Sequence, residues 1–195
     1  MIKTKADLNY YLAEDLKRIG RKMPWWKWLT FSETYRLYSY LRNLRYLEYY
    51  QNNRRWYNLP CYVYRMLQHR RMSLKYVMQV QPGSLGAGCK LLHPGYLRVT
   101  PGARIGKNCT IAPNVMLGKK QPGIERTDGG IVDVDRGELP LLIGDNCYIG
   151  TGVTILAPLT IGNNVTIGAN SLVVDDVPDN CMVSGVPAKV VKRFE

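Results

Sequence analysis

The sequence lacks the hydrophobic segments that would place it across a membrane. No run of about 18 apolar residues occurs, so we expect no transmembrane helix. The first residues, MIKTKADLNYYLAEDL, also lack the apolar core and the small-residue cleavage site of a signal peptide. These absences favour a cytoplasmic location.

Cysteine and histidine are too few, and too irregularly spaced, for a disulfide framework or a metal centre. The cysteines are odd in number and contain no CxxC pair, so we expect buried thiols in a reducing compartment. Only His69 and His93 are present, and we expect no metal site. No Gly-rich α/β domain precedes the second half, which excludes a nucleotidyltransferase fusion. The cysteines are Cys61, Cys89, Cys109, Cys147 and Cys181.

Charge divides the chain into two unlike halves. Residues 1–82 contain 16 Lys and Arg against 5 Asp and Glu, whereas residues 83–195 contain 11 against 10. The first half is therefore strongly basic and the second is nearly neutral. This contrast predicts a basic, aromatic-rich α-helical domain over 1–82 and a second domain over 83–195, with the boundary at Pro82–Gly83.

A period of six residues begins at this boundary. Each repeat carries two apolar positions that stand two residues apart, and 22 of the 24 positions are apolar, which excludes chance. The pairs are Leu85/Ala87, Leu91/His93, Leu97/Val99, Ala103/Ile105, Cys109/Ile111, Val115/Leu117, Leu141/Ile143, Cys147/Ile149, Val153/Ile155, Leu159/Ile161, Val165/Ile167 and Ser171/Val173.

Such a period is typical of a parallel β-helix. Three short strands make one triangular coil, and the paired side chains point inward and stack between coils. Twelve repeats predict about four coils and a mainly β fold. We expect the corners to hold strained φ values, at glycines such as Gly106 and Gly144 and at Asn108, Asn146 and Asn164.

The register of IGKNCTIAPNV and IGDNCYIGTGVTILAPLTIGNNVTIGANSLV resembles the left-handed β-helix acyltransferases of the hexapeptide-repeat family. The resemblance covers roughly 83–195 and is closest to the serine acetyltransferases. The Arg/Tyr-rich helical start is also similar to bacterial O-acetyltransferases encoded with surface-polysaccharide genes. The resemblance implies a bacterial homotrimer that binds acetyl-CoA in grooves between subunits.

His93 is the one ionisable residue at an inward-type position. The stretch Leu85-Gly86-x-Gly88-x-x-Leu91-x-His93 resembles the segment that precedes the catalytic histidine of serine acetyltransferases. A hydroxyl is a poor nucleophile until a base removes its proton, and imidazole titrates near neutral pH. We therefore expect His93 to be the general base; the alternative is a hydrogen-bonded core histidine.

Three residues that support serine binding in that branch are missing here. Residues 78–81 are MQVQ where the family has an aspartate that orients the histidine. Leu92 replaces the aspartate before the histidine, and Leu139–Pro140 replaces a His-Pro pair in the loop. These departures argue against serine as the acceptor. The resemblance of the helical start to the surface-polysaccharide enzymes implies instead a sugar hydroxyl on a lipid-linked or nucleotide-linked precursor.

Two further segments carry candidate site residues. The repeats are interrupted by a loop over 119–140, whose carboxylates could orient the base or bind the acceptor; they are Glu125, Asp128, Asp133, Asp135 and Glu138. Residues 175–195 resemble the family's C-terminal cap. The resemblance implies that CoA contacts small corner residues and cap cations, namely Gly150, Gly152, Gly168, Ala169, Lys189, Lys192 and Arg193.

The basic half predicts three helices. A capping box at Thr4-x-x-Asp7 begins the first, which ends at Gly20, and the third runs from Pro60 to about Arg71. Ser32 could cap the second helix, whose inward face is Leu37, Leu41, Leu44 and Leu47.

The simplest interpretation is that these helices cap the first coil of the β-helix. A peripheral contact with an anionic membrane surface, through Trp25, Trp26 and Trp28, is a second hypothesis. Nucleic-acid binding is the weakest hypothesis, and we expect no nucleic-acid partner.

Together these patterns predict an acetyl-CoA-dependent O-acetyltransferase with His93 as its base. Two alternatives stay open, a serine O-acetyltransferase of cysteine synthesis and a non-catalytic trimeric scaffold.

Overall fold

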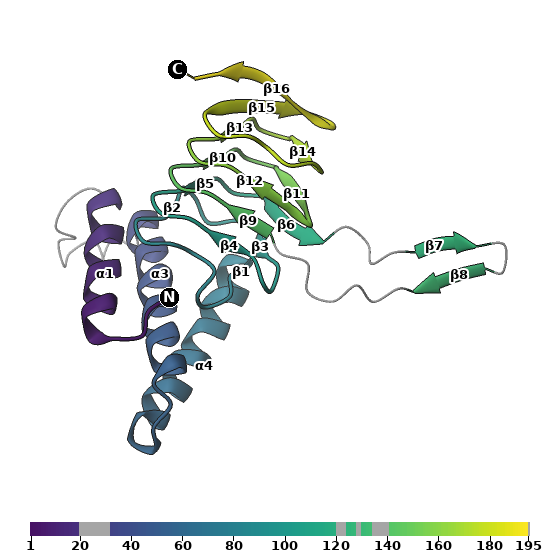
Figure 1. Cartoon of the computed structure of the whole chain (residues 1–195). Helices are drawn as coiled ribbons and strands as arrows, with labels where there is room; N and C mark the ends of the chain where they lie inside the picture. Colours follow the sequence, from purple (N-terminus) through teal and green to yellow (C-terminus); the bar gives the residue numbers. More distant parts are fainter. Residues whose placement is uncertain (20–31, 120–123, 128–129, 134–140, 195) are drawn as a thin grey trace.

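The computed structural model describes residues 1–19, 32–119, 124–127, 130–133 and 141–194. Helices lie at one end of a stack of short strands, and the C-terminus lies at the other end (Figure 1). A two-stranded antiparallel hairpin, β7 (Ile124–Thr127) and β8 (Gly130–Asp133), projects from one side within the predicted loop.

The described helices are α1 (Lys5–Ile19), α3 (Glu33–Asn52), the short 3₁₀ helix η1 (Trp56–Asn58) and α4 (Leu59–Tyr76). The bounds of α1 are as predicted, whereas α4 ends five residues beyond the predicted Arg71. Ser32 directly precedes α3, but its side chain makes no capping hydrogen bond, so that prediction is wrong. The capping box is confirmed, because Thr4 Oγ1 accepts from Asp7 N at 3.1 Å and Asp7 Oδ2 accepts from Thr4 N at 2.8 Å. The four predicted inward leucines of α3 are all buried. Gly20, Trp25, Trp26 and Trp28 lie outside the described residues.

Three parallel sheets form the faces of the β-helix. Sheet A contains β1 (Met78–Gln79), β3 (Leu97–Val99), β6 (Val115–Lys119), β11 (Thr154–Ala157) and β14 (Leu172–Val173). Sheet B contains β4 (Arg104–Ile105), β9 (Leu141–Ile143) and β12 (Leu159–Ile161). Sheet C contains β2 (Lys90–Leu91), β5 (Thr110–Ile111), β10 (Tyr148–Ile149), β13 (Thr166–Ile167), β15 (Cys181–Gly185) and the antiparallel β16 (Ala188–Arg193).

The β-helix begins before the predicted boundary. Strand β1 precedes Pro82–Gly83 and pairs in parallel with β3, with Met78 opposite Leu97. Sheet A therefore stacks five strands among the described residues, where four coils would supply four. The basic, helical half and the repeat half are joined by a shared strand rather than by a free linker.

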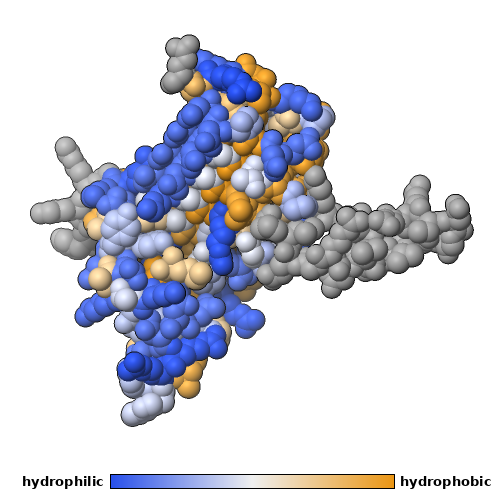
Figure 2. All heavy atoms as spheres, viewed as in Figure 1, coloured by the Kyte–Doolittle hydropathy of each residue, from blue (hydrophilic) through white to orange (hydrophobic). Residues whose placement is uncertain are grey.

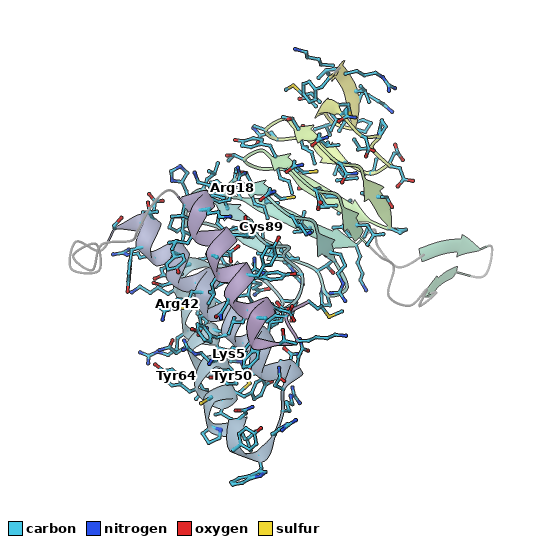
Figure 3. The ribbon with its side chains drawn as sticks, turned by 60° about the vertical axis from the view of Figure 1, so that its left-hand side comes forward. Lys5, Arg18, Arg42, Tyr50, Tyr64 and Cys89 are labelled. Atoms are coloured by element: carbon cyan, nitrogen blue, oxygen red, sulfur yellow. The ribbon has the colours of Figure 1, made fainter. Side chains whose placement is uncertain are left out.

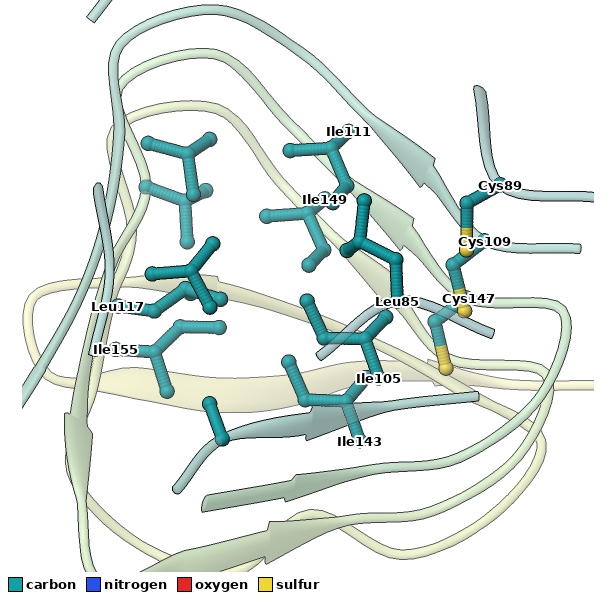
Figure 4. Packing of buried hydrophobic residues seen from close by; sticks show 14 of the residues in the cluster. Leu85, Cys89, Ile105, Cys109, Ile111, Leu117, Ile143, Cys147, Ile149 and Ile155 are labelled. Carbon is teal, nitrogen blue, oxygen red and sulfur yellow. The ribbon is translucent and has the colours of Figure 1, made fainter. Parts of the chain in front are cut away.

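The apolar ladder fills the interior of the triangle. Of the 24 positions, all except His93 are buried. Equivalent residues stack from coil to coil, such as Ile111 on Ile149 and Leu117 on Ile155 (Figure 4). Coil-on-coil burial of this kind supplies the main apolar driving force of the fold.

Four of the five cysteines are part of this core, but Cys61 in α4 is exposed, so the prediction of buried thiols is wrong for that residue. Cys89, Cys109 and Cys147 form one column (Figure 4). Each of the three thiols donates to a backbone carbonyl of the next coil, at 3.2 to 3.3 Å. All five are free thiols.

Corner glycines are needed for space rather than for strained φ. The predicted positive φ is confirmed at Asn108, Asn146 and Asn164, but Gly106 and Gly144 do not have it. Instead, a Cβ on Gly144 would lie 2.6 Å from Gly162 O, closer than real contacts allow. The coils approach so closely at this corner that hydrogen is the only side chain that fits.

A buried ion pair joins the helices to the first coil. Arg45 of α3 donates from Nε to Asp15 Oδ2 of α1 at 2.8 Å, and its other nitrogens donate to Leu85 O and Gly86 O at 2.6 and 2.7 Å. Asp15 also accepts from Gly88 N at 2.9 Å. The side chains of Arg45 and Asp15 are 0% and 1% exposed. We call this set the buried latch.

Arg18 extends the contact to the next coil. Its Nη2 donates to Asn108 O at 3.0 Å and to Thr110 Oγ1 at 3.1 Å. Figure 3 shows Arg18 at the end of α1 that faces the β-helix. The helices therefore cover the end of the stack where a β-helix would otherwise expose unpaired backbone.

Candidate active site

His93 points out of the β-helix, so the prediction of an inward position is wrong. Leu91 pairs with Ile111 and Leu97 with Val115, which leaves five residues, 92–96, where the next coil has three, 112–114. The two extra residues shift the register of this corner and lift His93 out of the ladder. Its side chain is 63% exposed.

Glu33, the first residue of α3, is the partner of His93. Oε1 of Glu33 lies 2.9 Å from Nδ1 of His93, and the carboxylate side chain is 49% exposed. A carboxylate accepts hydrogen bonds only, so Nδ1 carries the proton in this contact. In the neutral ring Nε2 then keeps its lone pair and is free to accept a proton. We call these two residues the corner pair.

A small pocket lies beside the corner pair. It has a volume of about 290 Å³ and lies between α3 and the segment 90–93. Its lining is mainly aliphatic, with Lys90 and His93 as the ionisable members; the other lining residues are Ile19, Thr34, Leu37, Leu41, Leu91 and Leu92. The pocket can therefore hold a small, partly apolar group next to a base.

The structure brings the predicted small residues to the same corner of the β-helix as His93. Backbone N–H groups of Leu92, Ala112, Gly150 and Gly168 each donate to a carbonyl of the sheet C strand one coil further along, at 2.8 to 3.0 Å. These four residues thus form one column. With about 4.8 Å between strands, Gly150 and Gly168 lie about 10 and about 15 Å from the level of His93.

Neighbouring coils approach each other closely at Gly150 and Gly152 of this corner. A Cβ on Gly150 would lie 2.8 Å from Ala169 N, and Gly152 has φ +74° with Asn170 Oδ1 only 2.1 Å from a built Cβ. Thr151 and Ala169 are exposed. The predicted set Gly150, Gly152, Gly168 and Ala169 therefore lies along one edge of the β-helix, where neighbouring coils approach each other too closely at Gly150 and Gly152 for a larger side chain. We call these four residues the glycine edge.

The predicted cap cations divide between the two ends of the last hairpin. Lys189 pairs with Ser184, at the end of β15 that belongs to the His93 corner. Lys192 and Arg193 pair with Met182 and Cys181, at the other end of that strand. All three are exposed. Only Lys189 is thus placed beside the glycine edge.

Glu33 is the site residue that sequence reasoning missed. The loop carboxylates proposed for this role, Glu125, Asp128, Asp133, Asp135 and Glu138, have side chains outside the described part of the structure. The sequence offered one indication of a role for Glu33, because it is one of only five acidic residues in 1–82. It stands in the first turn of a helix, where an acid is explained by the helix dipole alone, and so its contact across 60 residues could not be foreseen.

Residues 141–175 match the family model described as bacterial transferase hexapeptide (six repeats). This part of the β-helix consists of bacterial transferase hexapeptide repeats. Among curated relatives, the galactoside O-acetyltransferase of Escherichia coli is 38% identical over 93 residues, covering 46% of this chain and 43% of the relative. A serine acetyltransferase of Staphylococcus aureus is 37% identical over 109 residues, covering 52% and 48%. The matches thus span less than half of each of these hexapeptide relatives.

Solved structures agree over nearly the whole chain. The serine acetyltransferase of Neisseria gonorrhoeae has a TM-score of 0.65 at 28% identity, covering 98% of this chain and 67% of that one. A serine acetyltransferase of Brucella abortus in complex with coenzyme A has a TM-score of 0.67 at 21% identity, covering 98% and 70%. Together with the hexapeptide repeats, these likenesses imply a left-handed β-helix.

Two other features are absent from the described residues. No helix there is long and apolar enough to cross a membrane. Among these same residues, no group of three His, Cys, Asp or Glu side chains is placed to hold a metal ion.

Proposed function

We propose that this protein is an acetyl-CoA-dependent O-acetyltransferase in which His93 is the general base and Glu33 holds it in position. The observation that carries the proposal is the corner pair, a histidine fixed through Nδ1 by a carboxylate and open to solvent at the foot of a glycine edge. The relatives named as acetyltransferases support the reaction class.

The corner pair supplies the chemistry that hydroxyl acetylation needs. Nε2 of His93 removes the proton from the acceptor hydroxyl as its oxygen attacks the thioester carbonyl. When the tetrahedral intermediate collapses, the C–S bond breaks and the imidazolium returns the proton to the departing thiolate. Glu33 stabilises the imidazolium that forms in between and fixes the ring orientation, as a carboxylate does for other catalytic histidines.

Acetyl-CoA would lie along the edge of Gly150, Gly152, Gly168 and Ala169, with Lys189 available to its phosphates. The CoA complex of the Brucella abortus structure supports this choice of donor. One chain forms only one wall of such a groove, so we propose a homotrimer in which the neighbouring subunit supplies the other wall. Lys192 and Arg193 lie at the far end of β15, and in the trimer we assign them to the outer, nucleotide end of the groove.

A sugar hydroxyl is the acceptor that we propose. The galactoside O-acetyltransferase among the relatives supports it, and the absence of the three serine-binding residues argues against serine. Serine remains the second candidate, because the Neisseria gonorrhoeae structure with 28% identity is named for that substrate.

The test is release of free thiol from acetyl-CoA in the presence of a panel of acceptors that includes serine and galactosides. His93→Gln should lower the acceptor-dependent rate by about 100-fold or more, while CoA still binds and raises the melting temperature. His69→Gln is the matched control, since it removes the other histidine and should keep the rate within about twofold.

Each alternative outcome has a clear meaning. Full activity in His93→Gln would show that the assigned base is wrong. Turnover with serine exceeding that with every sugar would move the acceptor to serine. If CoA neither binds nor stabilises the protein, the scaffold interpretation holds instead.

A further inference from the structure

Helix α4 has an apolar stripe that no described part of the chain covers. Leu59, Val63, Leu67 and Leu74 recur at spacings of four, four and seven, which places them on one helical face. They are 54%, 39%, 51% and 82% exposed. The opposite face is the packed one, where Met72 and Tyr76 contact the core. We call the four residues the outer stripe.

Aromatic residues extend the outer stripe. Trp56, in η1 at the start of α4, is 87% exposed, and Tyr57 beside it is 52% exposed. Tyr64, labelled in Figure 3, is 56% exposed on the rim of the stripe. Figure 1 places the start of α4 at the end of the molecule farthest from the C-terminus.

Cations surround the outer stripe and carboxylates do not. Arg70, Arg71 and Lys75 are exposed on or beside it, and Arg54 and Arg55 are exposed before Trp56. Between Glu48 and Glu125 the sequence has 12 Lys and Arg and no Asp or Glu.

The elements that pack on α4 do not neutralise this charge. They are α3, η1 and β1, and their carboxylates are Glu33 and Glu48. Glu33 binds His93, and Glu48 is buried with Oε1 accepting from Ile2 N at 2.7 Å. The surface of α4 is thus both apolar and strongly positive.

We infer that α4 lies on an anionic lipid bilayer, with the outer stripe in the interface and the flanking cations on the headgroups. An acidic polymer would satisfy the cations but would leave the four aliphatic side chains in water. A bilayer satisfies both, since interfacial helices bury an apolar face of Leu and Trp beside a Lys/Arg-rich rim. The inference does not depend on the proposed reaction.

Figure 2 shows how hydrophobic residues are distributed over one face of the molecule. In the view of Figure 2 the hydrophobic residues gather over the β-helix, while the helical end is mainly hydrophilic.

The experiment is sedimentation of the full-length protein with vesicles of phosphatidylcholine alone or mixed equally with phosphatidylglycerol. We expect binding to the mixed vesicles that weakens with salt, and little binding to phosphatidylcholine alone. Leu67→Gln with Leu74→Gln should weaken binding by about tenfold or more, because both residues are exposed and their loss should not unfold the protein. Arg71→Gln with Lys75→Gln should weaken binding to the mixed vesicles by a smaller factor.

Val190→Gln with Val191→Gln is the matched control, since it removes two exposed aliphatic residues, 43% and 60% exposed, from strand β16. It should bind as the parent protein does. Equal binding to both vesicle types, or unchanged binding by the α4 variants, would overturn the inference. So would a change of oligomer size on substituting Leu67 and Leu74 without a change in vesicle binding, because the stripe would then be covered by a second copy of the chain.

Discussion

Helices meet the first coil of the β-helix at two places that use similar chemistry in opposite settings. The buried latch pairs Asp15 with Arg45, and the corner pair joins Glu33 to His93. Arg45 and Glu33 both belong to α3, and each is paired with a group outside that helix. The latch side chains are 0% and 1% exposed, whereas those of the corner pair are 63% and 49% exposed.

Burial decides what each pair can do. Inside the protein a charge is tolerated only with full compensation, and Arg45 has it from one carboxylate and two backbone carbonyls. Burial alone would lower the pKa of Arg45, but the adjacent Asp15 carboxylate outweighs burial and raises it, so the charge is permanent. The Glu33–His93 pair lies at the surface, where water screens the attraction and reaches the imidazole. The first pair suits structure and the second suits chemistry.

The largest effect should come from breaking the latch. Arg45→Met leaves the Asp15 carboxylate buried without its partner, and we expect a loss of about 3–5 kcal/mol in the free energy of unfolding, measured by urea denaturation. The double variant Arg45→Met with Asp15→Leu removes both charges and should recover part of the loss. If the single variant is as stable as the parent, the latch does not hold the helices on the coil.

A smaller effect, on activity rather than stability, should come from Glu33→Gln. The amide cannot stabilise an imidazolium, so we expect kcat to fall about tenfold or more while the melting temperature stays within about 2 °C. Glu33→Asp should restore part of the rate, and Glu14→Gln, which removes a partly exposed carboxylate of α1, should leave it unchanged. A matching loss of stability and activity would make Glu33 a structural residue and erase the contrast with the latch.

The fold was largely predictable because its signal repeats. Each coil presents the same inward pair, so 23 of 24 ladder positions could be identified as buried from period alone. The prediction failed at one corner. Residues 92–96 were taken as part of a regular repeat, so the exposed His93 was assigned to the interior. The corner glycines were chosen correctly for a wrong reason, since coil spacing rather than φ requires them.

The site was predictable only where it lies within one repeat. The glycine edge follows from the register, because Gly150 and Gly168 recur at one corner of successive coils. The role predicted for His93 came instead from the resemblance of the segment 85–93 to serine acetyltransferases. Glu33, Arg45 and Asp15 could not be found in this way. Their contacts join the helices to coils 40 to 73 residues further along the chain, and no periodicity links helix positions to strand positions. Tertiary packing alone brings them together.

The smallest effect concerns pH and separates the two histidines. His69 of α4 lies between the helices and β1, where its Nε2 donates to Val80 O at 3.1 Å and its Nδ1 is buried without a partner. Burial lowers the pKa of His69 below its usual range, and the Val80 contact offsets only part of this. The unfolded chain therefore takes up a proton at a higher pH than the folded one. It follows that stability is full above about pH 6.5 and falls as the pH is lowered from there.

Thermal unfolding between pH 5 and pH 8 tests this assignment. The melting temperature of the parent should drop by a few degrees toward pH 5, and His69→Gln, which keeps a donor for Val80 O but cannot titrate, should show a shallower drop. His93→Gln is the counterpart that should lose activity while keeping the fold. Identical pH profiles for the parent and His69→Gln would mean that His69 does not couple proton uptake to unfolding. The burial of His69 would then have no effect on the pH dependence of stability.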